Sequence, residues 1–175
     1  MAVLIEAISV VIRRSRIVEV WRGGWDGFVA DCPNQTLCAD RDLARVGFMN
    51  PDDVARYVDD LQRRGLVFQR GNEAVDIVVV DQMKGPTSSC DWVEFGRVEI
   101  GGHPVAACRL AVSDEQAVVT PSGWRFEGSL SATFGFVPTG LEDRSLRFLR
   151  REDGVEVYLN LLTGKEVFVG RTKSR

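Results

Sequence analysis

Residues 43–81 read LARVGFMNPDDVARYVDDLQRRGLVFQRGNEAVDIVVVD, and this segment predicts a strand, a helix and another strand in close succession. The helix is expected to begin at Pro51, because the side chain of Asn50 can accept a free backbone N–H and a proline has none to leave unpaired. It is expected to end at Gly65, since glycine readily adopts the left-handed conformation that closes a helix. Four apolar residues share one helical face through their three- and four-residue spacing, namely Val54, Tyr57, Val58 and Leu61. This face is expected to pack on a sheet.

The rest of the first half adds further strands and one more helix. An apolar run opens the chain, and Arg13-Arg14-Ser15-Arg16 interrupts it. Helical spacing follows, but Gly23 and Gly24 each weaken a helix by about 1 kcal/mol, so a break is expected there. Strands are predicted over residues 3–12, 36–39, 43–49 and 75–80, the last of them central, and a helix over residues 25–31. This order of strand, helix, strand, strand, helix and strand is that of a ferredoxin-like split βαβ sandwich.

The second half is expected to be rich in short strands. After Gly101-Gly102 the sequence alternates between apolar runs and turn residues, and strands are predicted over residues 105–112, 117–120, 124–127, 130–137 and 155–161. We therefore expect an α+β protein with a mainly antiparallel sheet. Two helices would cover one face of that sheet in residues 1–100, and a β-meander would form residues 101–175. No linker separates the halves, so residues 1–175 are expected to form a single compact unit.

A second grouping of the same elements is also open. Residues 43–100 predict a strand, a helix and three strands, carried by RVGFMNPDDVARYVDDLQRRGLVF, DIVVVDQ and DWVEF. This segment resembles the βαβββ module of the vicinal-oxygen-chelate, or glyoxalase-like, superfamily. Members of that superfamily typically hold a metal through His, Glu or Gln on strands, and Gln82 and Glu94 match these ligands by type. The only histidine of the chain, His103, lies outside the matching segment.

Composition excludes several classes of function. The 175 residues are 45% hydrophobic and 27% charged with a net charge of −3, which is typical of a globular protein and gives no basic footprint for nucleic acid. The apolar residues 1–12 contain Glu6 and are too short to cross a membrane, so a cytoplasmic protein is expected. The cysteines lack Cys-x-x-Cys spacing and are expected to be reduced, with no bound metal: Cys32, Cys38, Cys90 and Cys108.

Residues that could bind a ligand fall in two places. Trp21 and Trp25 lie among glycines, and the loop of residues 82–91 concentrates hydroxyl groups, a lysine and a thiol between two apolar strands. Binding pockets combine apolar walls with a few polar groups, so a site is predicted between these two segments. Its candidate residues are Trp21, Trp25, Lys84, Thr87, Ser88 and Cys90.

No set of residues in the sequence predicts catalysis. Cys90 and His103 are the one pairing that could activate a thiol, and their spacing does not support it, so no catalytic residue is assigned. The leading hypothesis is a cytosolic, non-enzymatic binding protein, such as an inhibitor or immunity-type partner protein that acts through surface complementarity. The alternative is a small-molecule-binding protein or metal-dependent enzyme with a glyoxalase-like cavity. The expected partner is a protein or a small molecule, no cofactor is expected, and the oligomeric state is left open.

Overall fold

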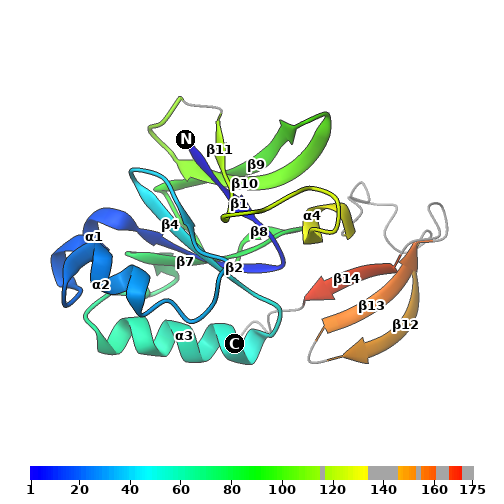
Figure 1. Cartoon of the computed structure of the whole chain (residues 1–175). Coiled ribbons are helices and arrows are strands. Elements are labelled where there is room, and N and C mark those ends of the chain that lie inside the picture. The colour runs from blue at the N-terminus through cyan, green and yellow to red at the C-terminus, as the bar shows by residue number, and fades with distance from the viewer. Residues whose placement is uncertain (115–116, 134–145, 153–154, 161–165, 171–175) are drawn as a thin grey trace.

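The computed structural model describes residues 1–114, 117–133, 146–152, 155–160 and 166–170. It is an α+β protein with mostly antiparallel sheets, as the sequence predicts. Figure 1 shows three layers in the main body: helices α1, α2 and α3, then a five-stranded sheet, then a four-stranded sheet. Among the described residues, no helix has the length and apolar character needed to cross a membrane.

The five-stranded sheet is built on three long antiparallel strands, β2 (Ile8–Arg13), β4 (Leu43–Phe48) and β7 (Ile77–Asp81). Two short strands, β3 (Cys38–Ala39) and β8 (Gly85–Pro86), form its edges, and the order is β3-β4-β2-β7-β8. Every neighbouring pair is antiparallel, and Val10 of β2 faces Val46 on one side and Val79 on the other.

Three helices, rather than the two predicted, cover one face of this sheet: α1 (Arg14–Val20), α2 (Gly24–Ala30) and α3 (Pro51–Arg63). Gly23 adopts a left-handed φ of 83°, which interrupts the helical conformation between α1 and α2. The residues before the predicted break therefore form a helix of their own, α1. Helix α3 is confirmed in detail, because Asn50 accepts the backbone N–H of Asp52 at 2.8 Å. Its predicted face is also buried, namely Val54, Tyr57, Val58 and Leu61.

The four-stranded sheet covers the opposite face and has the order β11-β1-β10-β9. Its strands are β1 (Ala2–Ile5), β9 (Val93–Ile100), β10 (His103–Leu110) and β11 (Val118–Val119). The pairing of β1 with β10 joins the two halves of the sequence in one sheet. A small hairpin of β5 (Gln69–Arg70) and β6 (Glu73–Ala74) lies outside both sheets.

The opening strand predicted over residues 3–12 is two strands in two different sheets. The chain turns at Ala7, whose φ of 49° is left-handed. The fully buried Gln82 holds this turn, because its Oε1 accepts the Ala7 N–H at 2.7 Å and its own backbone N–H donates to the Ala7 carbonyl at 2.9 Å. One apolar cluster therefore lies between the helices and β2, and a second lies between the two sheets.

Two strands predicted in the second half are wrong. Residues 124–127 are irregular rather than a strand, and Leu130–Thr133 form a short helix, α4, while residues 134–137 lie outside the described part. Glycines with left-handed φ values, 74° at Gly123 and 82° at Gly128, turn the chain on both sides of residues 124–127. Ser129 then accepts the Ala132 N–H at 3.3 Å, as a helix cap does.

The predicted C-terminal meander is present as β12 (Leu146–Glu152), β13 (Val155–Asn160) and β14 (Glu166–Gly170). These strands pair in order and antiparallel. Arg150 on β12 forms a bidentate ion pair with Glu166 on β14, with N···O distances of 2.9 and 3.0 Å.

Candidate functional site

An open cleft of about 840 Å³ lies where β2 passes into α1, beside the turn that joins β3 to β4. Its charged lining consists of Arg13, Arg14, Arg41, Asp40 and Asp42, and its apolar lining of Met1, Val18, Ala39 and Leu110. The cleft thus combines a cluster of arginines with apolar walls. We name it the arginine cleft.

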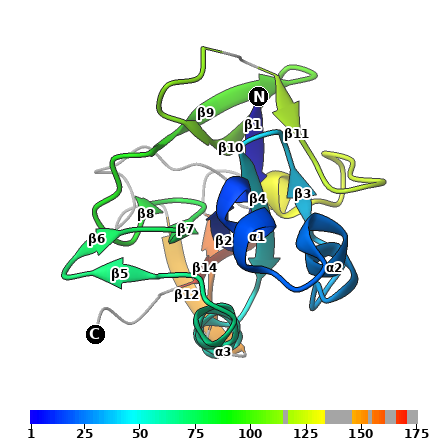
Figure 2. The same cartoon turned by 90° about the vertical axis from the view of Figure 1, so that its left-hand side faces the viewer.

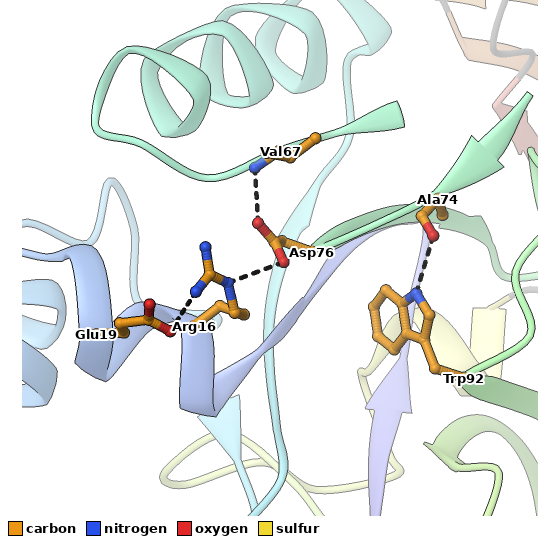
Figure 3. A network of polar contacts seen from close by, with 6 residues as sticks. All are labelled: Arg16, Glu19, Val67, Ala74, Asp76 and Trp92. Atoms are coloured by element: carbon orange, nitrogen blue, oxygen red, sulfur yellow. Dashed lines mark hydrogen bonds and ion pairs between the residues drawn. The ribbon is translucent and has the colours of Figure 1, made fainter. Parts of the chain in front are cut away.

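Arg13 is the last residue of β2, and its guanidinium lies over the ring of Trp92, with Cζ 4.7 Å from the ring centroid. Trp92 is buried and fixed in place, because its indole N–H donates to the carbonyl of Ala74 at 3.1 Å (Figure 3). The Nε of Arg13 is itself buried and has no hydrogen-bond partner within the described part of the chain. A buried donor without an acceptor is costly, so Arg13 is held here by its contact with the Trp92 ring rather than by a hydrogen bond at Nε.

Arg14 is held in a similar way by a second tryptophan. Its Cζ lies 4.0 Å from the ring centroid of Trp25, and one terminal nitrogen donates to the backbone carbonyl of Asp40 at 2.6 Å. A guanidinium on an aromatic face gains cation–π attraction and loses much of its rotational freedom. Arg13 and Arg14 are therefore both oriented before any ligand arrives.

The two aspartates of the cleft are engaged by other groups. The Oδ1 of Asp40 accepts the backbone N–H groups of Asp42 and Leu43, both at 2.7 Å, and its Oδ2 lies 3.6 Å from the Met1 amino nitrogen. Asp42 is 3.8 Å from the Nε of Arg41. Among the described residues, no carboxylate forms an ion pair with Arg13 or Arg14. These two guanidiniums leave the cleft with uncompensated positive charge.

Arg16, the third arginine of the run, has a structural role instead. Its Nε donates to Asp76 at 3.1 Å, and a terminal nitrogen contacts Glu19 (Figure 3). The buried Asp76 also accepts the Val67 N–H at 2.8 Å, and its carbonyl accepts the Arg13 N–H at 3.0 Å. This network anchors the start of α1 and so positions Arg13 and Arg14.

The site predicted between the tryptophans and the 82–91 loop is not brought together. Trp21 and Trp25 pack on Phe28 in the cluster beneath the helices, with centroid distances of 5.1 and 5.5 Å. Cys90 packs against the cluster between the two sheets. β8 lies at one edge of the five-stranded sheet, and Figure 2 shows α2 toward the other edge, on the side of β3.

The remaining residues of that prediction lie at or near the surface. Lys84 is exposed, Thr87 donates its hydroxyl to the Val79 carbonyl at 3.0 Å, and the buried Ser88 hydroxyl oxygen has no partner within the described residues. Ligand binding by these six residues stays a prediction. Trp25 contributes to the arginine cleft because its ring contacts the Arg14 guanidinium and orients it.

The polar residues considered for a metal site lie in different surroundings. Gln82 is buried at the Ala7 turn, Glu94 pairs with Arg109 at 2.8 Å, and the ring of His103 stacks on Phe126 with centroids 3.9 Å apart. No group of three or more His, Cys, Asp or Glu side chains within the described ranges could hold a metal ion. All four cysteines are free, and burial raises the pKa of the Cys90 thiol, which disfavours its nucleophilic thiolate form.

The sequence predicts only that the Arg13 to Arg16 run interrupts the opening strand. Three cations within four residues, directly after an apolar strand, were the available signal. Their aromatic partners could not be inferred, because Trp92 is far from Arg13 in the sequence.

No family model, curated protein or solved structure matches this chain. The geometry of the chain itself therefore carries the functional inference.

Proposed function

We propose that this chain is a cytoplasmic, non-enzymatic binding protein that takes an acidic group of a partner protein into the arginine cleft. The observation that supports this proposal is the pair of guanidiniums, Arg13 and Arg14, that lie on tryptophan rings without a carboxylate partner among the described residues. A carboxylate from a partner would supply the missing negative charge and would accept hydrogen bonds from the terminal N–H groups of these arginines. Hydrogen bonds to charged groups contribute about 1.5–3 kcal/mol each.

The rim of the cleft favours a protein partner over a free anion. Val18 is 53% exposed and Met1 is 40% exposed, and both lie beside the arginines. Arginine and methionine are enriched at protein interfaces, and arginine is common among the residues that dominate binding energy. A partner segment with an acidic residue next to an apolar residue matches this surface. An inhibitor or immunity-type protein would use such a surface without any catalytic group.

A small organic anion is the alternative occupant. The cleft volume of about 840 Å³ falls within the range of roughly 300–1,000 Å³ that is usual for ligand pockets. The glyoxalase-like interpretation of residues 43–100 is a separate proposal of a metal-dependent enzyme. Within that segment β4, β7 and β8 belong to one sheet and β9 to the other. A thermal shift with nickel, zinc or manganese would support the metal-dependent form, and the absence of any shift would count against it.

The strand order of the five-stranded sheet is relevant to the ferredoxin-like fold that the sequence suggests. The order along the chain is β2, α1, α2, β3, β4, α3 and β7. In the sheet, the four strands among these elements lie in the order β3-β4-β2-β7. This connectivity and spatial order support the ferredoxin-like arrangement that the sequence suggests. We propose that the four-stranded sheet and the meander are additions to that arrangement.

The test uses peptides of defined charge. A short capped peptide of alternating leucine and glutamate is titrated into the full chain, with the matching leucine and glutamine peptide as control, and binding is followed by tryptophan fluorescence. We expect the glutamate peptide to bind at least about tenfold more tightly, a difference of about 1.4 kcal/mol, and to weaken as salt rises.

Variants locate the binding. Arg14→Gln should reduce affinity for the glutamate peptide, whereas Arg56→Gln should not, because Arg56 lies on the exposed surface of α3 and pairs with Asp53. Equal binding of both peptides, or equal loss in both variants, would refute the proposal. Binding of small aromatic carboxylates but not of the peptide would favour the small-molecule alternative.

A further inference from the structure

Glu6 is a buried carboxylate in the turn between β1 and β2, with only 7% of its surface exposed. An ionised carboxylate is expensive to bury unless hydrogen bonds or opposite charges compensate it. The arrangement around Glu6 supplies this compensation for one oxygen of the carboxylate and not for the other.

Three donors converge on Oε1. The Trp124 indole N–H donates at 3.1 Å, the Ser131 backbone N–H at 2.9 Å and the Ser131 hydroxyl at 2.6 Å. No donor within the described part of the chain reaches Oε2. Trp124 and Ser131 are far from Glu6 in the sequence, so the chain folds back to build this site.

The neighbouring Arg45 does not donate a hydrogen bond to Glu6 Oε2 either. Arg45 is fully buried, and its guanidinium donates to the Glu6 backbone carbonyl at 3.0 Å, to the Ser9 hydroxyl at 2.8 Å and to the Thr36 carbonyl at 3.2 Å. Its hydrogen bonds therefore stabilise the turn around Glu6, and its charge attracts the Glu6 carboxylate, while Oε2 accepts no hydrogen bond from the described residues.

A largely open cavity of about 430 Å³ has Glu6 among its lining residues. Its charged lining is Glu6, Glu127 and Arg125, which sum to a net charge of −1, and Trp124 and Leu130 supply apolar wall. Two glycines with left-handed φ, Gly123 and Gly128, keep its edge free of side chains. This volume lies at the lower end of the range for small-molecule pockets.

We propose that this cavity binds a small organic cation, a protonated amine or guanidinium compound, whose N–H donates to Glu6 Oε2. The donors on Oε1 hold the carboxylate in one orientation, and Oε2 then presents a fixed acceptor at the cavity wall. Trp124 and Leu130 lie beside an apolar body attached to the cationic group. This site is distinct from the arginine cleft, shares no lining residue with it and does not depend on the function proposed for it.

Phenethylammonium and its neutral analogue 2-phenylethanol are suitable probes, because they differ mainly in the charged group. The readout is the indole N–H resonance of Trp124 in ¹⁵N-labelled full chain, assigned by its loss in Trp124→Phe. We expect phenethylammonium to shift this resonance saturably and to bind at least tenfold more tightly than the alcohol. Equal binding of amine and alcohol, or a Trp124 resonance that neither probe shifts, would overturn the proposal.

Two variants and a control test the role of charge. Glu6→Gln keeps an oxygen for the Oε1 donors but removes the charge, and should weaken amine binding at least tenfold. Glu127→Gln should weaken it severalfold without changing any Glu6 hydrogen bond, so it serves if Glu6→Gln fails to fold. Glu94→Gln is the matched control, because Glu94 lies outside the cavity and pairs with Arg109. Amine binding that stays unchanged in Glu127→Gln and in any folded Glu6→Gln protein would also overturn the proposal.

Discussion

The guanidinium of Arg14 lies on the indole of Trp25, with Arg14 Cζ 4.0 Å from the ring centroid, and this contact joins the first residue of α1 to α2. It links the arginine cleft to the packing of the helices, because Trp25 also stacks on Phe28. Any change in the orientation of Trp25 therefore changes the cleft.

This contact predicts a measurable coupling between the two side chains. In a double-mutant cycle with Arg14→Gln and Trp25→Leu, we expect a coupling free energy of about 0.5–1 kcal/mol, the usual value for a cation–π pair near the surface. Urea unfolding of the two single variants and the double variant measures it. Arg56→Gln combined with Trp25→Leu is the control and should be additive, and a zero coupling for Arg14 would contradict the stacked geometry.

The turn at Ala7 predicts unequal effects of two substitutions. Gln82→Leu removes the acceptor of the Ala7 N–H but also removes the buried Nε2 donor, which has no partner among the described residues, so it should lower the free energy of unfolding by about 1 kcal/mol, the lower end of the usual range. Ala7→Gly relieves a left-handed φ that costs a non-glycine residue about 1–2 kcal/mol, against an entropic loss of about 0.5–1 kcal/mol. The glycine variant should therefore be at least as stable as the parent in urea unfolding. A Gln82→Leu protein as stable as the parent would contradict this account.

Asp81 predicts a specific pH dependence. Burial raises the pKa of this carboxyl above its ordinary value of 3.8, although the backbone N–H groups of Met83 and Lys84 oppose the shift. Between the unfolded and folded pKa values the folded state binds more protons, so this group lowers stability as pH rises through that window. Asp81→Asn keeps an acceptor oxygen and removes the titration.

We expect the stability of Asp81→Asn relative to the parent to increase from pH 3.5 to pH 7, as measured by urea unfolding at each pH. Comparing the two proteins cancels the titration of the other carboxylates. A difference that is independent of pH, or that decreases toward pH 7, would show that Asp81 does not titrate as the burial implies.

The pairing of β1 with β10 predicts that the two halves are not separable. Residues 1–100 alone would lack the partner of β1 and leave Val3, Leu4 and Ile5 exposed. We expect this fragment to show poor dispersion of backbone amide signals in ¹⁵N-labelled protein, while the full chain unfolds in one transition. Limited proteolysis provides an independent check, since a stable fragment ending near Ile100 would contradict a single unit.

Helix α3 could be predicted because all its determinants are local. Asn50, Pro51 and the apolar face lie within twelve residues of one another, and the structure uses each as expected. The split of residues 3–12 could not be seen, because β1 and most of β2 are buried on both faces and their sequence does not mark a change of sheet. The failure at residues 130–133 has a long-range cause, since Ser131 donates to Glu6. The alternation of apolar and polar residues over 130–136 cannot reveal a hydrogen-bond partner that is so distant in the sequence.

In the candidate sites too, some residues could be recognised from the sequence and their partners could not. The arginines of the cleft were visible as a charge run, but the tryptophans that they contact come from α2 and from the residue before β9. Glu6 was visible as one acidic residue in an apolar run, and its three donors come from residues 124 and 131. Sequence reasoning identifies residue types, whereas these sites depend on contacts between segments that are distant in the chain.

The position of β1 also affects synthesis on the ribosome. Ala2 pairs with Arg109 in β10 and with Val118 in β11, so β1 is synthesised about a hundred residues before its partner strands. At roughly 5–20 residues per second this delay lasts about 5–20 s, during which the apolar segment AVLI has no strand to pair with. Translation speed and chaperone access in that interval should therefore influence the yield of folded protein.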